Sequence, residues 1–265
     1  MTTTIAFAGK GGVGKTSIAA LFIRLLIEHA AGSILAVDAD PASNLHLALG
    51  LPPARSIGDI REETLQEAQG GSLPTGVARR DWLDYAVRAA VEEGDHVDLI
   101  AMGRPEGPGC YCAVNHMLRQ IMDALGRAYD YVVIDNEAGM EHLSRRTTQD
   151  VDLLFLVSDP TLRGVLAAEQ MARLAASLQI RVGRVWLVLN RVMEPLPLPL
   201  QQAIAGTGLE LAASVPFDPI LAEFDGNGRP IAELPTTSLA YQTARELVER
   251  TLAETRTPVG QTRRR

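Results

Sequence analysis

The chain has 265 residues, of which 46% are apolar, 22% charged and only 5% aromatic. These proportions are those of an ordinary globular protein and exclude a disordered or fibrous chain. The formal net charge of −7 argues against general nucleic-acid binding, which needs a basic surface. No apolar run reaches the length of about 18 residues that a membrane span needs, and no secretory signal opens the chain. We therefore expect a cytoplasmic protein without a membrane or nucleic-acid partner.

Short apolar runs alternate with helical patterns along most of the chain. The expected strands, rich in Val, Ile and Leu, cover residues 4–8, 34–37, 97–101, 131–134, 153–157, 185–189 and 209–215. The expected helices cover residues 16–30, 113–125, 162–176 and 237–252. Apolar strands of this length are typical of a parallel sheet that is buried on both faces. Their alternation with helices predicts a doubly wound α/β fold, mostly parallel, with helices on both faces.

The pattern is continuous enough to predict a single domain over residues 1–255. Residues 51–96 carry two weak helical patterns, at 57–68 and 81–92, and we interpret them as an insertion specific to a family. A proline-dense stretch at 194–199 predicts a rigid loop after a strand. Residues 256–265 have the composition of a disordered tail.

A glycine-rich run follows the first expected strand, opens a helix and fits the pattern G-x-x-x-x-G-K-[ST]. It consists of Gly9, Lys10, Gly11, Gly12, Val13, Gly14, Lys15 and Thr16, with Ser17 next. Glycines let backbone N–H groups turn toward phosphate oxygens, and the helix N-terminus adds positive partial charge. In a P-loop, Lys15 would reach the β- and γ-phosphates and Thr16 would ligate Mg²⁺. The run predicts a P-loop NTPase that binds nucleotide and Mg²⁺.

Carboxylates follow two further expected strands. Asp38 and Asp40 come after the strand at 34–37, and Asp135 comes after the strand at 131–134. The carboxyl ends of parallel strands meet at one edge of the sheet, so we expect these side chains beside the P-loop. An aspartate in the position of Asp135 would hold the Mg²⁺ shell. Asp38 either binds Mg²⁺ through water or caps its loop, and the sequence leaves both open.

The second lysine of the P-loop, Lys10, gives it the form Lys-Gly-Gly-x-Gly-Lys-Thr. This form resembles the deviant Walker A motif of MinD, ParA, the nitrogenase iron protein and the arsenite-pump ATPase. In that group the extra lysine reaches across a dimer interface to the partner's nucleotide. The resemblance implies a homodimer in which Lys10 acts in trans.

Further residues match the same group. The Asp-Pro-Ala-Ser-Asn run from Asp40 to Asn44 resembles switch I of the arsenite-pump branch, which implies that Asp40 orients the attacking water. The group also contacts adenine through an Asn and a Pro-containing loop, which here are Asn190 and the run that holds Pro216 and Asp218. Asn190 could instead cap a turn. No guanine-reading run is present, which favours ATP and ADP.

Two cysteines, Cys110 and Cys112, lie one residue apart in a run rich in Gly and Pro. A disulfide across this spacing would be strained, whereas two thiols are a soft ligand set for Zn²⁺, Ni²⁺ or Cu⁺. A zinc site usually has four ligands, so a two-fold dimer could complete a four-sulfur site. Whether His116 is a further ligand stays open.

The Gly-x-x-Cys-Tyr-Cys run that ends at Cys112, and the run Asp-Asn-Glu-Ala-Gly-Met-Glu-His-Leu-Ser-Arg-Arg-Thr that begins at Asp135, closely resemble the CooC family. CooC proteins are nickel-insertion accessory ATPases of carbon monoxide dehydrogenase. The resemblance implies an ATP-hydrolysing homodimeric metallochaperone that holds nickel, or zinc, through Cys110 and Cys112 of both subunits. The client would be the carbon monoxide dehydrogenase apoenzyme.

Three other functions remain to be weighed. Maturation of another nickel enzyme, of the acetyl-CoA synthase type, would look much the same in sequence. A positioning ATPase of the MinD or ParA type would need a C-terminal amphipathic helix or a basic face, which the sequence disfavours. An electron-transfer ATPase like the nitrogenase iron protein would need a later cysteine, and none follows Asp135.

Overall fold

The computed structural model describes residues 2–70, 78–103, 113–138, 150–177 and 181–255. Their strands form one eight-stranded sheet in the order β3-β4-β2-β5-β1-β6-β7-β8. All neighbouring strands pair in parallel except the antiparallel pair β3 and β4. The strands are β1 (Thr3–Gly9), β2 (Ile34–Ala39), β3 (Glu92–Glu93), β4 (Asp98–Ala101), β5 (Tyr131–Asn136), β6 (Asp150–Ser158), β7 (Arg181–Val192) and β8 (Glu210–Pro216).

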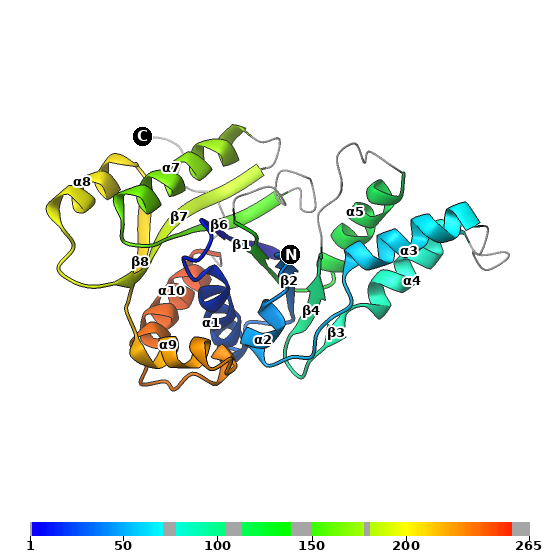
Figure 1. The fold of residues 1–265 in the computed structure, drawn as a ribbon, viewed down its shortest axis with the longest axis horizontal. Helices are drawn as coiled ribbons and strands as arrows, with labels where there is room; N and C mark the ends of the chain where they lie inside the picture. The colour runs from blue at the N-terminus through cyan, green and yellow to red at the C-terminus, as the bar shows by residue number, and fades with distance from the viewer. Residues whose placement is uncertain (1, 71–77, 104–112, 139–149, 178–180, 256–265) are drawn as a thin grey trace.

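Helices cover both faces of this sheet (Figure 1). One face carries α1 (Lys15–Glu28), α2 (Leu45–Leu49), α9 (Pro219–Gly226), the 3₁₀ helix η1 (Ile231–Glu233) and α10 (Leu239–Thr255). The other carries α3 (Ile57–Gly70), α4 (Arg79–Ala89), α5 (Ala113–Gly126), α7 (Leu162–Ser177) and α8 (Leu198–Gly206). The doubly wound, mostly parallel α/β fold expected from the sequence is therefore confirmed.

The core beneath α1 contains most of the few aromatic side chains that are fully buried. Phe155 stacks on Phe7 with ring centroids 4.9 Å apart, and it also contacts Phe22 of α1 and Trp186 of β7. These contacts join α1 to β1, β6 and β7. Because α1 starts at the P-loop, this packing fixes the position of the P-loop relative to the central strands.

Several elements differ from the sequence prediction. Helices α2, α8 and α9 and the short strand β3 were not expected. The proline-dense stretch, interpreted as a rigid loop, runs into α8, which begins at Leu198 with Pro199 in its first turn. A proline is tolerated there because a first-turn N–H has no partner within the helix. Strand β7 starts before the predicted residue 185 and continues to Val192, so Asn190 lies inside the strand.

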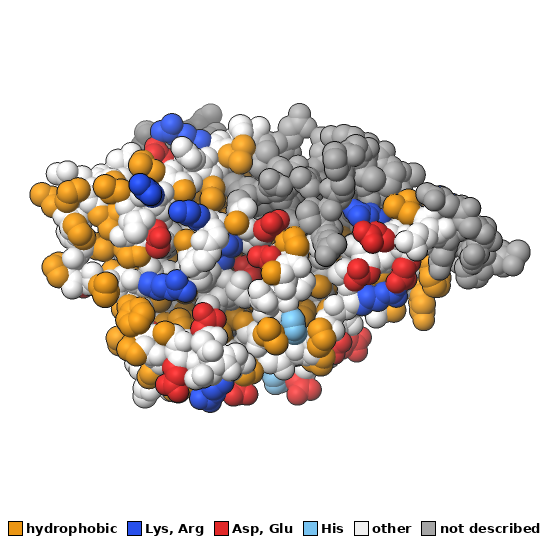
Figure 2. All heavy atoms as spheres, viewed as in Figure 1, with side chains coloured by type: hydrophobic (Ala, Val, Ile, Leu, Met, Phe, Trp, Pro, Cys, Tyr) orange, Lys and Arg blue, Asp and Glu red, His pale blue; other side chains and the backbone are white. Residues whose placement is uncertain are grey.

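The described helices include none that is both long and apolar enough to span a bilayer. Figure 2 shows Lys and Arg side chains interspersed with Asp and Glu over one face of the molecule. The weak helical patterns in residues 51–96 correspond to α3 and α4. The expected tail at 256–265 lies outside the described residues, and the single-domain organisation over 1–255 stays a prediction.

Candidate nucleotide-binding site

The glycine-rich run connects β1, in the middle of the sheet, to the N-terminus of α1. Gly14 caps α1 in a left-handed conformation, with φ of 86°. A Cβ atom at Gly14 would lie 2.4 Å from Nδ2 of Asn190. Both the conformation and the close approach require glycine at this position. The strand–loop–helix context is the one that a P-loop needs.

Positive charge gathers at this end of α1. The side chain of Lys15 is buried with the residue only 7% exposed, and its Nζ donates to the carbonyl of Lys10 at 3.3 Å. The first turn of α1 has no acidic residue, so nothing there neutralises the positive end of the helix dipole. Lys10 itself is exposed at the mouth of the loop. The loop thus offers backbone N–H groups and lysine charge to a phosphate chain.

Asp135 lies at the carboxyl end of β5, fully buried beside Thr16. Burial raises the pKa of its carboxyl to about 7; a hydrogen bond with Thr16 lowers it, and the nearby charge of Asp38 raises it. Within the described part of the chain, its Oδ1 has no hydrogen-bond partner. A buried carboxylate oxygen without a partner, next to a threonine hydroxyl, suits a hard cation that takes oxygen ligands. Thr16 and Asp135 together could therefore hold Mg²⁺.

Asp38 and Asp40 shape the adjacent loop. Asp38 is buried, and it accepts hydrogen bonds from the backbone N–H of Asp40 at 3.1 Å and of Leu45 at 2.9 Å. Burial raises its pKa, while these two hydrogen bonds lower it. The loop-capping alternative is thus present in the structure, and a water-mediated contact with Mg²⁺ stays a prediction. Asp40 accepts from Ala42 N at 2.9 Å.

A cleft of about 580 Å³ opens beside the P-loop. The described residues that line it are Gly11, Gly12, Gly14, Lys15, Thr16, Ser17, Asp40, Asn44, Leu47, Ala48, Glu137, Ala138, Arg191, Asp225, Gly228, Arg229 and Ile231. A second pocket of about 320 Å³ is lined by Ser17, Asn190, Arg191, Pro216, Phe217, Asp218, Leu221, Ala222, Asp225 and Gly226. The two share Ser17, Arg191 and Asp225. Residues predicted to contact phosphates and residues predicted to contact adenine therefore line adjoining spaces.

Asn190 and Asp218 have structural partners in this second pocket. Asn190 donates from Nδ2 to the carbonyl of Val13 at 2.8 Å, which ties β7 to the P-loop. Asp218 caps α9 and also accepts hydrogen bonds from Ser238, just before α10, and from Ala240 in its first turn. Burial raises the pKa of Asp218, but these hydrogen bonds outweigh it, and the pKa is lowered. Contacts of either side chain with adenine stay predictions.

Sequence reasoning missed several lining residues. Arg191 follows Asn190 directly inside β7, and no motif in the sequence indicates that its side chain borders these two spaces. Asp225 and Arg229 lie in and after α9, a helix that was not expected, and no motif points to them. Arg229 places its guanidinium carbon 3.8 Å from the ring centroid of Phe224.

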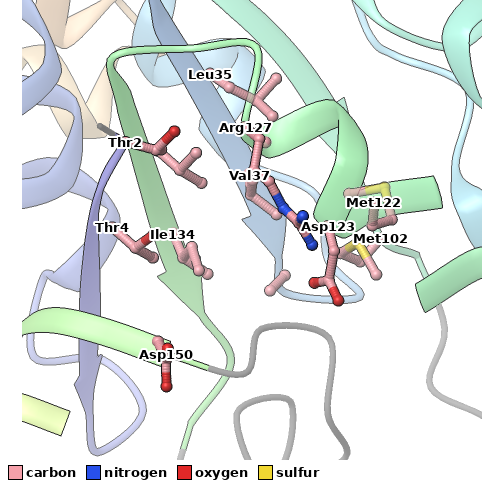
Figure 3. Close-up of a pocket in the computed structure, with 13 residues that line it drawn as sticks. Thr2, Thr4, Leu35, Val37, Met102, Met122, Asp123, Arg127, Ile134 and Asp150 are labelled. Atoms are coloured by element: carbon pink, nitrogen blue, oxygen red, sulfur yellow. The ribbon is translucent and has the colours of Figure 1, made fainter. Parts of the chain in front are cut away.

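The predicted metal ligands Cys110 and Cys112 lie outside the described residues. Elsewhere in the chain, among the residues that are described, no three His, Cys, Asp or Glu side chains gather at a metal-binding distance. A further cavity of about 290 Å³ lies between α5 and the sheet, with Met102, Met122, Asp123 and Arg127 on one side (Figure 3). None of the described residues that line it is a predicted site residue.

Together, a P-loop after the central strand of a parallel sheet and carboxylates at the neighbouring strand ends define a P-loop NTPase of the MinD and ParA fold. The chain belongs to the family described as the CobQ/CobB/MinD/ParA nucleotide binding domain, whose model matches residues 4–231. It is thus a member of an ATP-binding family.

Relatives in sequence fall into characterised and uncharacterised groups. An uncharacterized ATP-binding protein of Methanocaldococcus jannaschii is 41% identical over 246 residues, which cover 93% of this chain and 97% of that protein. The carbon monoxide dehydrogenase accessory protein CooC of Rhodospirillum rubrum is 32% identical over 236 residues, which cover 84% of this chain and 87% of that protein.

Solved structures of the fold include the septum site-determining protein MinD of Pyrococcus horikoshii OT3, complexed with Mg-ADP. It superposes with a TM-score of 0.69 at 20% identity and covers 98% of this chain and 100% of that one. A ParA family ATPase from Chlorobium tepidum TLS gives the same TM-score and identity, with 94% and 99% covered. At this level of identity the likeness concerns the fold alone.

Proposed function

We propose that the protein is an ATP-hydrolysing homodimeric metallochaperone that assists nickel insertion into carbon monoxide dehydrogenase. The observation that carries this proposal is the combination of a P-loop cleft with a Cys110-x-Cys112 motif in a chain 32% identical to CooC. The cleft supports the binding and hydrolysis of ATP. The two cysteines, together with the similarity to CooC, support nickel as the metal that is delivered.

In the proposed hydrolysis, the P-loop backbone and Lys15 hold the β- and γ-phosphates. Thr16 and Asp135 hold Mg²⁺, which would neutralise charge on the transferred phosphoryl group. Asp40, which lines the cleft, accepts a hydrogen bond from the attacking water and orients it toward the γ-phosphate. The products are ADP and phosphate. Lys10, exposed at the mouth of the loop, is free to approach the nucleotide of a second subunit.

In the proposed metal site, each subunit supplies two thiolates, and a dimer supplies four. Along the sequence, one helix and one strand separate these cysteines from Asp135. Helix α5 begins at Ala113, directly after Cys112, and leads to β5, which carries Asp135 at its end. A change in the dimer on hydrolysis could therefore reach the cysteines through α5 and β5.

Metal binding is tested by anaerobic titration of reduced protein with Ni²⁺, with and without ATP. The charge-transfer absorbance of thiolate and the molecular mass are read together. We expect one nickel per dimer, growth of dimer mass, and loss of the band in the Cys110→Ser/Cys112→Ser variant. This variant contains no cysteine, because the chain has only two. A nickel site that survives in the variant would place the metal elsewhere, and a His116→Asn variant shows whether that histidine adds a ligand.

ATP hydrolysis is tested by phosphate release. The Lys15→Ala variant should release no phosphate. The control is Arg181→Asn, which also removes one positive side chain but lies at the first residue of β7 and lines neither the P-loop cleft nor the adjoining pocket. Arg181 is exposed and pairs with Asp150. Hydrolysis that persists in Lys15→Ala would contradict the assignment of this cleft as the active site.

A further inference from the structure

Arg191 holds an unusual backbone conformation at the edge of the nucleotide cleft. It lies in β7 directly after Asn190, where the pairing of β7 with β8 shifts register. Its φ is 60°, in the left-handed region that residues other than Gly, Asn and Asp rarely adopt. Such conformations persist where surrounding contacts enforce them, and they concentrate at functional sites.

One hydrogen bond joins this residue to its neighbour in β7, and another joins it to the P-loop. Its backbone N–H donates to Oδ1 of Asn190 at 2.9 Å, and Nη1 of its guanidinium donates to the carbonyl of Gly12 at 3.0 Å. Asn190 in turn donates to Val13. Asn190 and Arg191, near the end of β7, therefore donate hydrogen bonds to two successive carbonyls of the P-loop.

The guanidinium also stands where the two adjoining spaces meet. Arg191 is one of three residues that line both the P-loop cleft and the pocket beside Pro216. A nucleotide with its terminal phosphates in the P-loop and its base in that pocket would pass its ribose and first phosphate between them. A guanidinium carries five N–H donors, and the bond to Gly12 uses one. The others can face that part of the nucleotide.

We propose that Arg191 binds the α-phosphate of the nucleotide while its guanidinium also holds the carbonyl of Gly12. The residue would thereby connect the pocket proposed for the base with the P-loop that holds the terminal phosphates. This inference rests on the proposed nucleotide-binding function and deepens it. Arginine suits the task because its planar fork can hold a carbonyl and a phosphate oxygen at once. A phosphate contact of this kind would favour ADP and ATP over ligands that occupy the P-loop alone.

The competing explanation is that Arg191 only holds the P-loop in shape. The two explanations differ in how they treat pyrophosphate, which reports the P-loop without an α-phosphate attached to ribose. If Arg191 acts only through Gly12, its removal lowers the affinities for pyrophosphate and ADP equally. If it binds the α-phosphate, ADP is weakened far more than pyrophosphate.

The test measures affinities for ADP and pyrophosphate, both with Mg²⁺, by competition against a fluorescent ADP analogue. The Arg191→Asn variant removes the guanidinium and keeps a residue that tolerates a positive φ. Because hydrogen bonds to charged groups are strong, we expect ADP affinity to fall about tenfold to a hundredfold, with pyrophosphate affinity nearly unchanged. Arg181→Asn on the same strand is the control and should change neither affinity.

Arg191→Lys is the second variant and keeps the inference testable if Arg191→Asn does not fold. Lysine retains the positive charge without the planar guanidinium, so this variant should also lower ADP affinity, but by less than Arg191→Asn. ADP affinity unchanged in both variants, or an equal loss of ADP and pyrophosphate, would overturn the role of Arg191 and leave the proposed function intact. Wild-type protein that binds no adenine nucleotide would overturn both.

Discussion

Replacing Asp135 with asparagine should make the nucleotide-free protein more stable at alkaline pH. The carboxyl is fully buried at the end of β5, and burial raises its pKa from 3.8 to about 7. An asparagine has nearly the same shape and can still accept the hydrogen bond from Thr16. The substitution therefore removes the ionisation and leaves the packing almost unchanged.

The magnitude follows from the difference in pKa between the folded and unfolded chain. The folded pKa is the higher one, so folding is favoured while the group is protonated, and this advantage is lost as pH rises through about 7. One pKa unit is worth about 1.4 kcal/mol, so ionised Asp135 destabilises the folded protein by about 4 kcal/mol. Between pH 5 and pH 8, linkage predicts a loss of about 2 to 3 kcal/mol from this residue.

The assay is urea unfolding of wild type and Asp135→Asn without nucleotide or Mg²⁺, at several pH values. Other titrating groups are shared by the two proteins, so the difference in their free energies of unfolding isolates Asp135. We expect the free energy of unfolding of Asp135→Asn, minus that of the wild type, to increase by about 2 to 3 kcal/mol from pH 5 to pH 8. A difference that stays constant over this range would refute the reasoning, because it would mean that Asp135 is already ionised at pH 5. Added Mg²⁺ should reduce the penalty in wild type only.

Three further changes probe the loops around the cleft. Asp218→Ala removes the cap of α9 and the bonds to Ser238, and should lower the free energy of unfolding by about 2 to 4 kcal/mol in chemical denaturation; a loss no larger than that of an exposed alanine substitution would contradict this. Gly14→Ala places a Cβ 2.4 Å from Asn190 Nδ2 at a left-handed position, which distorts the P-loop. Titration calorimetry should then show ADP binding at least tenfold weaker, and unchanged ADP affinity would contradict the requirement for glycine at this position. Asp40→Asn should keep ADP affinity while phosphate release falls about 10²-fold or more, and equal turnover would remove Asp40 from catalysis.

The sequence predicts the fold well because its signals are local. Each central strand contains an uninterrupted apolar run, and a parallel sheet buried on both faces needs such runs. The elements that were missed are marginal in length or composition. Helix α2 has five residues, and its first N–H is held by the carboxylate of Asp38, a contact between residues seven positions apart. Such a tertiary contact leaves no periodic trace in the sequence.

In the candidate site, too, residues that belong to a local motif are predictable from the sequence, whereas residues defined by their spatial neighbours are not. The P-loop residues and Asp135 follow from motif and strand position, and the structure places Asp135 beside Thr16, which lines the cleft. Arg191 and Arg229 could not be assigned, because their relevance depends on which spaces their side chains border. Asp218 shows a related limit: the resemblance implies a base contact, which stays a prediction, but no motif indicates that its carboxylate caps α9 and bonds to the start of α10. Position along a strand predicts location but not the partner of a side chain.

The most direct test of the central claim is activation of nickel-free carbon monoxide dehydrogenase by the nickel-loaded protein with Mg-ATP. We predict activation by the wild type that exceeds the activation by free Ni²⁺ at the same concentration. Activation should be lost in Cys110→Ser/Cys112→Ser, which cannot hold the metal, and in Lys15→Ala, which cannot use the nucleotide. Equal activation by wild type and the cysteine-free variant would contradict the account, and a protein that hydrolyses ATP without activating this client would point to another nickel enzyme or to a positioning role.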